Sequence, residues 1–409
     1  MKFDESSLYN IKSDIDGTRC PLFDLAIWKN GLAFKKIDFS EIGRPVIKIA
    51  ELNNGINSNT SFTQGNYGED VYIRWDDLLF SWSGNPQTSI DVFRYRLQDG
   101  WLNQHIFKVT ANEELVTKDF LYYVLKFLKP YFTQIATNKQ TTGLGHVTIA
   151  DLKRMSLVVP SKEVQNQIVS ILKAIDDKIE VNTNINDNLS AQIEAHLLAY
   201  LDNEDALPVK LGDYLYIKGR IGWKGLKKSE YLPQSGYRII NGETLTQSGI
   251  DWNKAGYISE ERYVESPEIM LKVGDILLSK DGTIGKIGYV DSLELPTSVA
   301  SGIFVIRNTK PDIISTTFIY YLLKSRLFTS FIAARTEGSV IPHLYQKDFM
   351  EFEFPLPTAE KMADFEEITE PMFSQIINNL NENKRLALLR DSLLPKLMSG
   401  ELDVSSIDL

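Results

Sequence analysis

The chain contains one segment twice, and this internal repeat restricts its fold more than any other feature. Residues 146–201 and 343–398 align at a constant offset of 197 positions with no gap, so that Asp151 falls on Asp348. Upstream, residues 77–126 continue the match at an offset of 198. A repeat of this length predicts two copies of one module, each a globular part (a head) followed by a long helix, related by an approximate two-fold axis.

The composition agrees with a folded protein of two globular units plus connecting helices. The chain has 409 residues, of which 43% are hydrophobic and 11% aromatic, which is too long for one core and too apolar for a disordered chain. Cys20 is the only cysteine, which excludes an internal disulfide and a Cys-based zinc cluster. The polar amino terminus and the absence of a long apolar run predict neither a signal peptide nor a membrane anchor, and we expect a cytoplasmic protein.

The charge is unevenly distributed. The formal net charge is −10, but residues 161–205 carry −6 and residues 358–409 carry −5, which leaves the heads at about +1. Phosphate contacts require Lys and Arg. Acidic helices with nearly neutral, locally basic heads are compatible with DNA on the heads and a protein partner on the helices. Ordinary solvated helix faces are the alternative interpretation.

Each repeat ends in a predicted long helix. Ser161 after Pro160 and Thr358 after Pro357 are typical helix N-caps. Apolar residues then recur at alternating spacings of four and three, which predicts a coiled-coil seam. The seam positions are Ile168, Leu172, Ile175, Ile179, Leu189, Ile193 and Tyr200 in the first copy, and Phe365, Met372, Ile376, Leu386, Leu393 and Leu397 in the second.

Asparagines occupy the middle of both seams, at Asn182, Asn186, Asn379 and Asn383. Buried amides cost stability but fix register and orientation, so we expect the two helices to pair with each other at these layers. The alternative is that the asparagines mark a break in each helix. Pro371 predicts a kink in the second helix. At ~1.5 Å per residue, each helix would be a rod of roughly 55 Å.

The heads are predicted to be mixed strands and turns with few helices. Residues 273–279 and 286–290 flank a glycine-rich turn and predict a hairpin. Residues 118–126 and 317–324 predict matching amphipathic helices. The expected fold is therefore α+β, with two globular heads separated by an antiparallel coiled coil of two long helices and an internal pseudo-two-fold repeat.

The sequence offers no catalytic constellation. It lacks a phosphate-binding G-x-x-x-x-G-K-[ST] loop and an Asn-Pro-Pro-Tyr methyltransferase motif, and its four histidines show no metal spacing. Among these, His146 and His343 are repeat equivalents, either structural or DNA-facing. The glycines of residues 282–288 could form a phosphate cradle, but a turn is the favoured interpretation because no helix follows. We expect the chain not to be an enzyme by itself.

The heads do carry amides, hydroxyls, aromatic rings and bases of the kind that contact DNA. Ordinary polar surface loops are the alternative interpretation of each. The candidates in the first copy are Ser81, Trp82, Ser83, Asn85, Gln87, Lys139, Thr141 and Thr142. Those in the second copy are Arg220, Trp223, Lys224, Ser279, Lys280, Thr283, Lys286, Arg335, Ser339 and His343.

Three segments carry a family resemblance: GRIGWKGL at residues 219–226, GDILLS with DGTIG at residues 274–285, and LLPKLMSGEL at residues 393–402. With the order head, helix, head, helix, the chain resembles over nearly its whole length the specificity subunit of type I restriction-modification systems. The resemblance implies two target-recognition domains, at residues 1–160 and 207–357. They would lie at opposite ends of two conserved spacer helices, at residues 161–206 and 358–409.

The resemblance also implies the function and the partners. Each domain would read one half of a bipartite sequence in double-stranded DNA. The helices would dock two copies of the modification subunit, which uses S-adenosylmethionine to methylate adenine at N6, and restriction subunits would use ATP and magnesium. This chain would then need no cofactor of its own. Residues 77–84 depart from the usual glycine-rich hairpin, so we expect the two heads to read different half-sites.

Physical reasoning supports that implication. A rod of ~55 Å would let the heads engage major grooves one or more turns apart, where a turn is roughly 34 Å. Antiparallel helices would present the heads to opposite strands. Two other functions remain open: a non-catalytic coiled-coil scaffold or adhesin with two ligand-binding heads, and a self-sufficient nuclease or methyltransferase.

Overall fold

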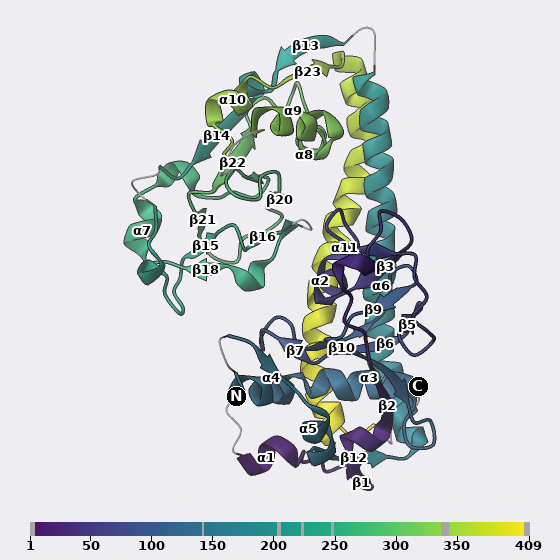
Figure 1. Ribbon diagram of the computed structural model, residues 1–409. Coiled ribbons are helices and arrows are strands. Elements are labelled where there is room, and N and C mark those ends of the chain that lie inside the picture. Colours follow the sequence, from purple (N-terminus) through teal and green to yellow (C-terminus); the bar gives the residue numbers. More distant parts are fainter. Residues whose placement is uncertain are drawn as a thin grey trace. The chain divides into compact units, whose positions relative to one another are not determined.

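The computed structural model describes residues 5–140, 143–202, 206–221, 225–246, 249–336 and 343–404 (Figure 1). The chain divides into two compact units, the first formed by residues 1–180 with 383–409 and the second by residues 181–382. Two long helices, α6 (Lys162–Leu201) and α11 (Ala359–Ser399), contribute residues to both units. None of the described helices has the length and apolar content needed to cross a membrane.

The first head alternates short strands with short helices. Its helical elements are α1 (Glu5–Tyr9), η1 (Leu22–Leu25), η2 (Lys36–Asp38), α2 (Ile49–Asn54), α3 (Lys118–Phe127), α4 (Lys129–Asn138) and α5 (Ile149–Arg154). Its strands are β1 (Gly17–Pro21), β2 (Ala26–Asn30), β3 (Arg44–Ile47), β4 (Phe62–Thr63), β5 (Tyr72–Ile73), β6 (Leu78–Ser81), β7 (Ser83–Gly84), β8 (Asp91–Arg94), β9 (Gly100–Leu102), β10 (Ile106–Ala111), β11 (Gly145–His146) and β12 (Ser156–Pro160).

The second head has a similar order of helices and strands, with a few elements added or missing. Its helical elements are η3 (Leu211–Tyr214), η5 (Lys228–Glu230), η6 (Trp252–Lys254), α7 (Glu260–Val264), η7 (Pro267–Ile269), α8 (Thr316–Lys324), α9 (Arg326–Thr336) and α10 (Gln346–Met350). Its strands are β13 (Leu207–Lys210), β14 (Leu215–Gly219), β15 (Arg238–Ile240), β16 (Leu245–Thr246), β17 (Gly249–Ile250), β18 (Gly256–Tyr257), β19 (Ile276–Ser279), β20 (Ile287–Tyr289), β21 (Thr297–Val299), β22 (Ile303–Asn308) and β23 (Glu353–Leu356).

The same sheet forms the centre of each head. The strand order is β2-β10-β6-β8 in the first head and β14-β22-β19-β20 in the second, and all neighbouring strands are antiparallel. A parallel pair accompanies each sheet, β3 with β9 and β15 with β21. The predicted hairpin in the second head is confirmed, because β19 pairs with β20.

One antiparallel strand pair joins the two ends of each head. In the first head β1 pairs with β12, which places Gly17 opposite Pro160. In the second head β13 pairs with β23, which places Leu207 opposite Leu356. The chain therefore enters and leaves each head at the same point, directly beside a long helix.

Matching helices bury the same positions in both heads. Thr117 caps α3 by accepting a hydrogen bond from the amide of Phe120, and Ser315 caps α8 in the same way for Phe318. Five apolar positions of each helix are buried at an offset of 198, which confirms the predicted amphipathic pair. The prediction of few helices in the heads is wrong, since α4 and α9 also follow α3 and α8. The sequence did not predict α4 and α9 because their amphipathic pattern is weak.

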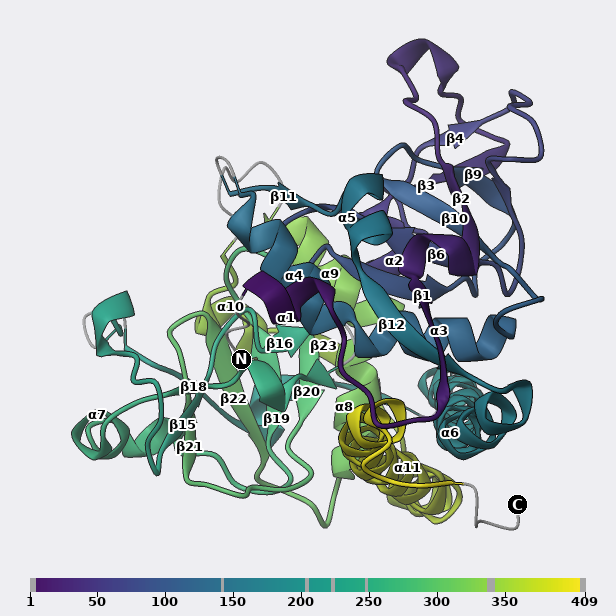
Figure 2. The ribbon, with the colours of Figure 1, turned by 90° about the horizontal axis from the view of Figure 1, so that it is seen from below.

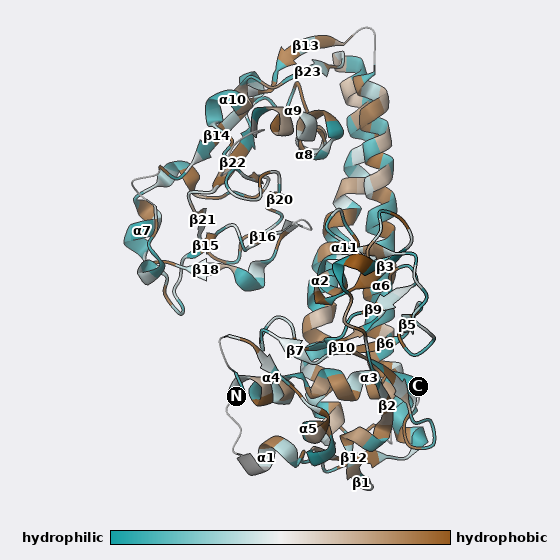
Figure 3. Ribbon diagram, in the orientation of Figure 1, coloured by the Kyte–Doolittle hydropathy of each residue, from teal (hydrophilic) through white to brown (hydrophobic). Residues whose placement is uncertain are grey.

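The helices α6 and α11 run antiparallel within each unit. In the first unit Asn383 donates to the carbonyl of Ile179 at 3.4 Å and Arg390 donates to Asp176 at 2.8 Å. Residue numbers therefore fall in one helix as they rise in the other. Figure 2 views the two helices nearly end-on and shows them side by side, and Figure 3 shows hydrophobic and hydrophilic residues interspersed along both.

The asparagine layer in the second unit forms a direct amide contact. Asn379 donates to Asn186 at 2.8 Å, and Asn186 donates to the carbonyl of Ile376 at 3.3 Å. The nearby Asn182 donates to Glu382 at 2.8 Å. Both helices continue through these positions, so the interpretation of the asparagines as helix breaks is wrong. The predicted apolar seam positions are buried or half-buried on both sides of them.

Candidate nucleic-acid interface

Each head has one of two equivalent sites. The site lies at the end of β6 in the first head and at the end of β19 in the second. We call them strand-end sites and define each by five repeat-equivalent residues. The first strand-end site consists of Trp82, Ser83, His105, Phe107 and His146. The second strand-end site consists of Lys280, Asp281, Gly302, Phe304 and His343.

The backbone of the first strand-end site is fixed by hydrogen bonds from two directions. The amide of Trp82 donates to the carbonyl of His105 at 3.2 Å, and the carbonyl of Trp82 accepts from the amide of Val147 at 2.8 Å. Beside it, β7 pairs with β11 so that Ser83 lies opposite His146. The strand-end turn and the returning segment are thus held together.

The second strand-end site repeats these bonds at equivalent atoms. The amide of Lys280 donates to the carbonyl of Gly302 at 2.8 Å, and the carbonyl of Lys280 accepts from the amide of Leu344 at 2.9 Å. A β-bridge places Asp281 opposite His343. Both heads therefore hold the same backbone geometry at this point, and only the side chains differ.

An aromatic cluster occupies the first strand-end site. The indole of Trp82 stacks on Phe107, with ring centroids 5.7 Å apart and planes at 28°, and lies beside His105 at 5.8 Å. Its Nε1 donates to Asn30 at 3.0 Å. Because the indole N–H is already bonded, the half-exposed ring offers its partners an apolar surface.

Charged groups occupy the second strand-end site. The ammonium of Lys280 lies over the ring of Phe304, 5.2 Å from the centroid, and 4.0 Å from Oδ2 of Asp281. The other carboxylate oxygen of Asp281 contacts Nδ1 of His343. A cation and an anion are thus held side by side, with the carboxylate exposed.

The predicted contact residues around these turns divide into buried and exposed positions. Ser81 is buried, and so is Ser279, whose hydroxyl donates to the carbonyl of Thr283 at 2.7 Å and accepts from an amide of the hairpin. Asn85, Gln87 and Thr283 are exposed. The serines shape the turns, and the exposed residues are available to a ligand.

Lys139 lies in a different setting from the other predicted contacts. Its ammonium donates to both carboxylate oxygens of the buried Asp151 at 2.6 Å. Burial by itself raises the pKa of Asp151, but the hydrogen bonds from Lys139 and Thr148 outweigh it, and the pKa is lowered. The charge of the partly exposed Lys139 is therefore neutralised by a buried carboxylate that also forms the α5 cap.

Arg220 corrects an expectation from the sequence. We expected it on an exposed basic stretch, but its side chain is 2% exposed. It donates to the carbonyl of Val299 at 3.1 Å and to Ser298 at 3.3 Å, and burial and the nearby Arg262 lower its pKa. A guanidinium that is 2% exposed cannot meet a phosphate in this conformation.

The remaining predicted residues are partly described. The ammonium of Lys286 donates to the carbonyl of Gly242 at 2.9 Å, and the exposed Arg335 stacks over Phe331 at 3.7 Å. Thr141, Thr142, Trp223, Lys224 and Ser339 lie outside the described residues. All these residues remain predictions as DNA contacts.

The sequence prediction missed several residues of the strand-end sites. Asn30, His105, Phe107, Asp281 and Phe304 were not among the candidates, although they position or flank the candidates that were chosen. The repeat offset could have found some of them. An offset of 198 aligns Trp82 with Lys280, and an offset of 197 aligns Phe107 with Phe304, so the two sites share an aromatic ring beside a residue that differs.

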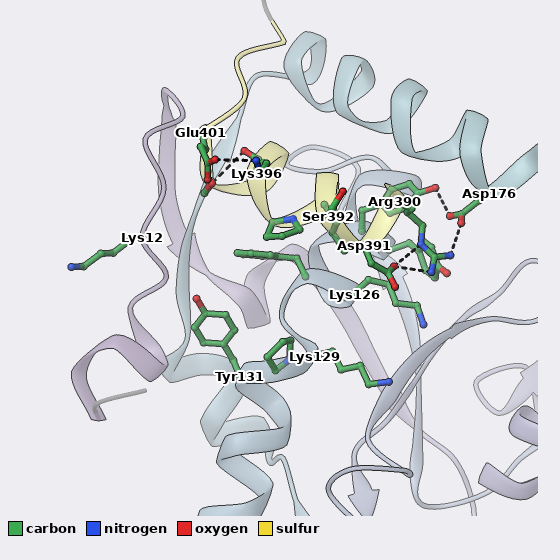
Figure 4. A pocket seen from close by; sticks show the side chains of 17 residues that line it. Lys12, Lys126, Lys129, Tyr131, Asp176, Arg390, Asp391, Ser392, Lys396 and Glu401 are labelled. Atoms are coloured by element: carbon green, nitrogen blue, oxygen red, sulfur yellow. Dashed lines mark hydrogen bonds and ion pairs between the residues drawn. The ribbon is translucent and has the colours of Figure 1, made fainter. Parts of the chain in front are cut away.

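A cleft of about 760 Å³ is a second candidate, in the first unit (Figure 4). It lies between α3, the start of α4 and the end of α11 and contains both lysines and aromatic rings. Its charges pair with each other, Arg390 with Asp176 and Asp391, and Lys396 with Glu401. Lys12, Lys126 and Lys129 also line the cleft, and the last two pair with Asp91 outside the lining, so the cleft keeps an excess of positive charge. Among the described residues, no His, Cys, Asp and Glu cluster could hold a metal ion.

Comparison with known families matches this architecture. The family described as the type I restriction modification DNA specificity domain matches the chain twice, at residues 19–191 and 203–389. The duplicated fold with a paired helix after each head thus defines a tandem DNA-specificity protein. Because the two matches cover most of the chain, the protein belongs to this family.

Individual relatives agree over most of their lengths. The MjaVIII type I restriction enzyme specificity subunit of Methanocaldococcus jannaschii is 22% identical, over 83% of this chain and 82% of the relative. The EcoBI specificity subunit of Escherichia coli is also 22% identical, over 98% and 91%. The crystal structure of a type I restriction-modification S subunit from M. genitalium superimposes with a TM-score of 0.52 at 19% identity, covering 97% and 98% of the two chains.

These findings confirm the family, the α+β architecture and the DNA-recognition class predicted from the sequence. The scaffold or adhesin interpretation is not favoured. The relatives are specificity subunits, in agreement with the prediction that the chain is not by itself an enzyme.

Proposed function

We propose that this chain selects the DNA target of a type I restriction-modification enzyme, with each head reading one half of a bipartite sequence. The observation that carries this proposal is the pair of strand-end sites. Equivalent backbone hydrogen bonds build both of them, yet they hold different side chains. Two equivalent sites with different side chains fit a DNA target whose two half-sites differ in sequence.

The two long helices support a fixed distance between the half-sites. They contain 40 and 41 residues, or about 60 Å at ~1.5 Å per residue. Antiparallel pairing is present within each unit, and it fits a reader whose two heads would address opposite strands. The amide contact between Asn186 and Asn379 would hold the register on which that distance depends.

The surface of the helices supports a protein partner. In the second unit, Val181 is 51% exposed and Ile185 41% exposed, and with Leu189 they line a shallow groove of about 340 Å³. Exposed apolar patches of this kind mark interaction sites. We place a modification subunit there, a second copy elsewhere on the helices, and the restriction subunits on the assembled complex.

The chemistry would belong to those partners. The modification subunit would bind S-adenosylmethionine and extrude an adenine from the stack to methylate N6, and the restriction subunits would use ATP and magnesium. This chain would select the DNA sequence and would need no cofactor of its own. We expect the complex to act in the cytoplasm.

Mapping methylated adenines tests the proposal. The full chain is co-expressed with the modification subunit, and methylated sites are sequenced. The expected result is a split motif with a constant gap. A contiguous motif, or methylation without sequence preference, would overturn the proposal.

A helix-length variant tests the measuring role directly. Seven residues are inserted in α6 between Glu180 and Val181 and seven in α11 between Glu382 and Asn383, which preserves the heptad pattern. The helix pair should lengthen by about 10 Å, and the gap should grow by about 3 base pairs. The matched control carries the α6 insertion alone, which shifts the register and should impair assembly. An unchanged gap in the double variant would exclude the helices as the spacer.

A further inference from the structure

We propose that the second strand-end site reads a G·C pair and that the first strand-end site reads an A·T pair. This inference rests on the proposed function and names the bases that each site selects. It begins from the equivalence of Trp82 and Lys280, which lie at the same point of the repeated backbone. A difference in base preference at this point therefore comes from side chains and not from a different approach of the backbone.

The second strand-end site offers a donor and an acceptor next to each other. The ammonium of Lys280 and Oδ2 of Asp281 are 4.0 Å apart. In the major groove, guanine presents the acceptors O6 and N7, and its paired cytosine presents the N4 donor. Lysine binds the former and a carboxylate binds the latter. Adjacent Lys and Asp side chains therefore match both halves of one G·C pair.

Neighbouring groups fix that pair in position. The ring of Phe304 lies beneath the ammonium of Lys280 at 5.2 Å, and Nδ1 of His343 contacts the other oxygen of Asp281. Gly302 lies beside the carboxylate, where an added Cβ would be in ordinary van der Waals contact with Asp281 at 3.5 Å. The charged groups are thus oriented before DNA arrives, which limits the entropy lost on binding.

The first strand-end site offers an apolar surface instead. The indole of Trp82 is stacked on Phe107, and its N–H is bonded to Asn30. The adjacent hydroxyl of Ser83 can donate or accept, and serine contacts bases of either kind. Apolar side chains distinguish thymine by contact with its C5-methyl group. This combination matches an A·T pair and has no charge to pair with guanine.

An exchange of side chains between the sites tests the inference. The variant Lys280→Trp with Asp281→Ser gives the second site the chemistry of the first, and Trp82→Lys with Ser83→Asp makes the reverse exchange. Each is assembled with the modification subunit and assayed on a library with both half-sites randomised. The first variant should lose roughly 10- to 100-fold of its preference for G·C at one position of one half-site. The other half-site and the gap should not change.

Smaller substitutions keep the test valid if an exchange disturbs folding. Lys280→Arg retains a guanine donor and should keep the G·C preference, whereas Lys280→Met and Asp281→Asn should each relax it at the same position. Lys310→Ala removes an exposed charge at the far end of β22 and serves as the matched charge control. It should leave the preference as it is in the unmodified chain.

The outcomes separate the inference from the proposed function. If the unmodified chain yields a split motif but Lys280→Met and Asp281→Asn leave every position unchanged, the assignment of bases is overturned and the proposed function stands. A preference at the affected position for anything other than G·C in the unmodified chain also overturns it. If the unmodified chain yields no split motif, both fail together.

Discussion

The first and second units attach a head to a long helix by different chemistry at equivalent positions. In the first unit, Tyr123 donates to Asp176 at 2.7 Å, and Asp176 also accepts from Arg390 at 2.8 Å. In the second unit the repeat places Tyr321 and Phe373 at the positions of Tyr123 and Asp176, and their rings pack edge to face at 6.1 Å. The first joint contains an ion pair, whereas the second combines the aromatic contact with a hydrogen bond from Tyr321 to Ser190 at 3.2 Å.

This difference shows that the shared fold does not depend on the chemistry of the joint. The backbone is positioned by residues common to both copies, such as Phe120 and Phe318, which are almost fully buried. The joint can then diverge, with Ile193 at the position of Arg390. What changes is the response to conditions, because an ion pair depends on salt and pH and an aromatic contact does not.

The largest effect is expected from Phe373→Ala in the second unit. Phe373 is 5% exposed and contacts Tyr289, Tyr320 and Tyr321. Its removal leaves a cavity and should lower the free energy of unfolding by about 3–5 kcal/mol, measured by urea denaturation of the full chain. Ile368→Ala, at an exposed position of the same helix, is the control. A loss below about 1 kcal/mol would show that the aromatic joint does not hold this head.

The polar joint should be weaker and sensitive to salt. Arg390→Gln removes the partner of Asp176 while these side chains are 29% and 24% exposed, so the loss should be about 1.5–3 kcal/mol. Denaturation at low and high NaCl should show a smaller loss at high salt, because ions screen the pair. The exposed Arg385→Gln is the matched control. A loss that does not depend on salt would mean that packing, and not charge, holds the first joint.

A third comparison concerns one turn before the central strand. The second unit has Gly274 there with φ of 92°, and the first unit has Asp76 with φ of 73°. Gly274→Ala should cost about 1–2 kcal/mol from backbone strain alone, since an added Cβ would meet no atom within 4 Å. Gly236→Ala, at an exposed glycine with equally open surroundings, should be nearly neutral by thermal unfolding. Equal effects at both glycines would remove the conformational explanation.

The smallest effect on the free energy of unfolding is expected when the pH is lowered and Asp76, in the same turn, becomes protonated. Burial alone would raise the pKa of Asp76, but Lys118 and Arg96 lower it from 3.8 to about 2. A carboxyl whose pKa is depressed on folding stabilises the fold above its unfolded pKa, and the contribution is lost as pH falls from about 4 toward 2. Unfolding by urea across this range should show a shallower pH dependence for Asp76→Asn than for the unmodified chain. Parallel curves would exclude Asp76 as the acid-sensitive group.

The sequence predicted the parts of the fold that follow from local pattern. The repeat, the seam positions and the α3–α8 pair all depend on periodic burial within a single helix or on direct alignment, and the structure confirms them. The hairpin at β19 and β20 was equally visible because glycines punctuate its turn. These features need no information about distant contacts.

The features that were missed depend on contacts between distant residues. Arg220 is buried because β14 ends at Gly219 and the chain turns inward to meet Val299, 79 residues later. Lys139 is paired because α4 and α5 bring it onto Asp151. Neither local charge nor composition distinguishes such a residue from an exposed cation, so the sequence alone could not separate buried from exposed basic residues.

The strand pairs β1–β12 and β13–β23 have a consequence for how new targets could arise. Gly17 lies opposite Pro160 and Leu207 opposite Leu356. The first and last strands of each head are therefore paired neighbours, and both ends of the head lie close together. A foreign cassette with the same two border strands could replace everything between them, whatever its internal length, without moving either helix. Under the proposed function, the bases that are recognised and the gap between them would then be inherited separately.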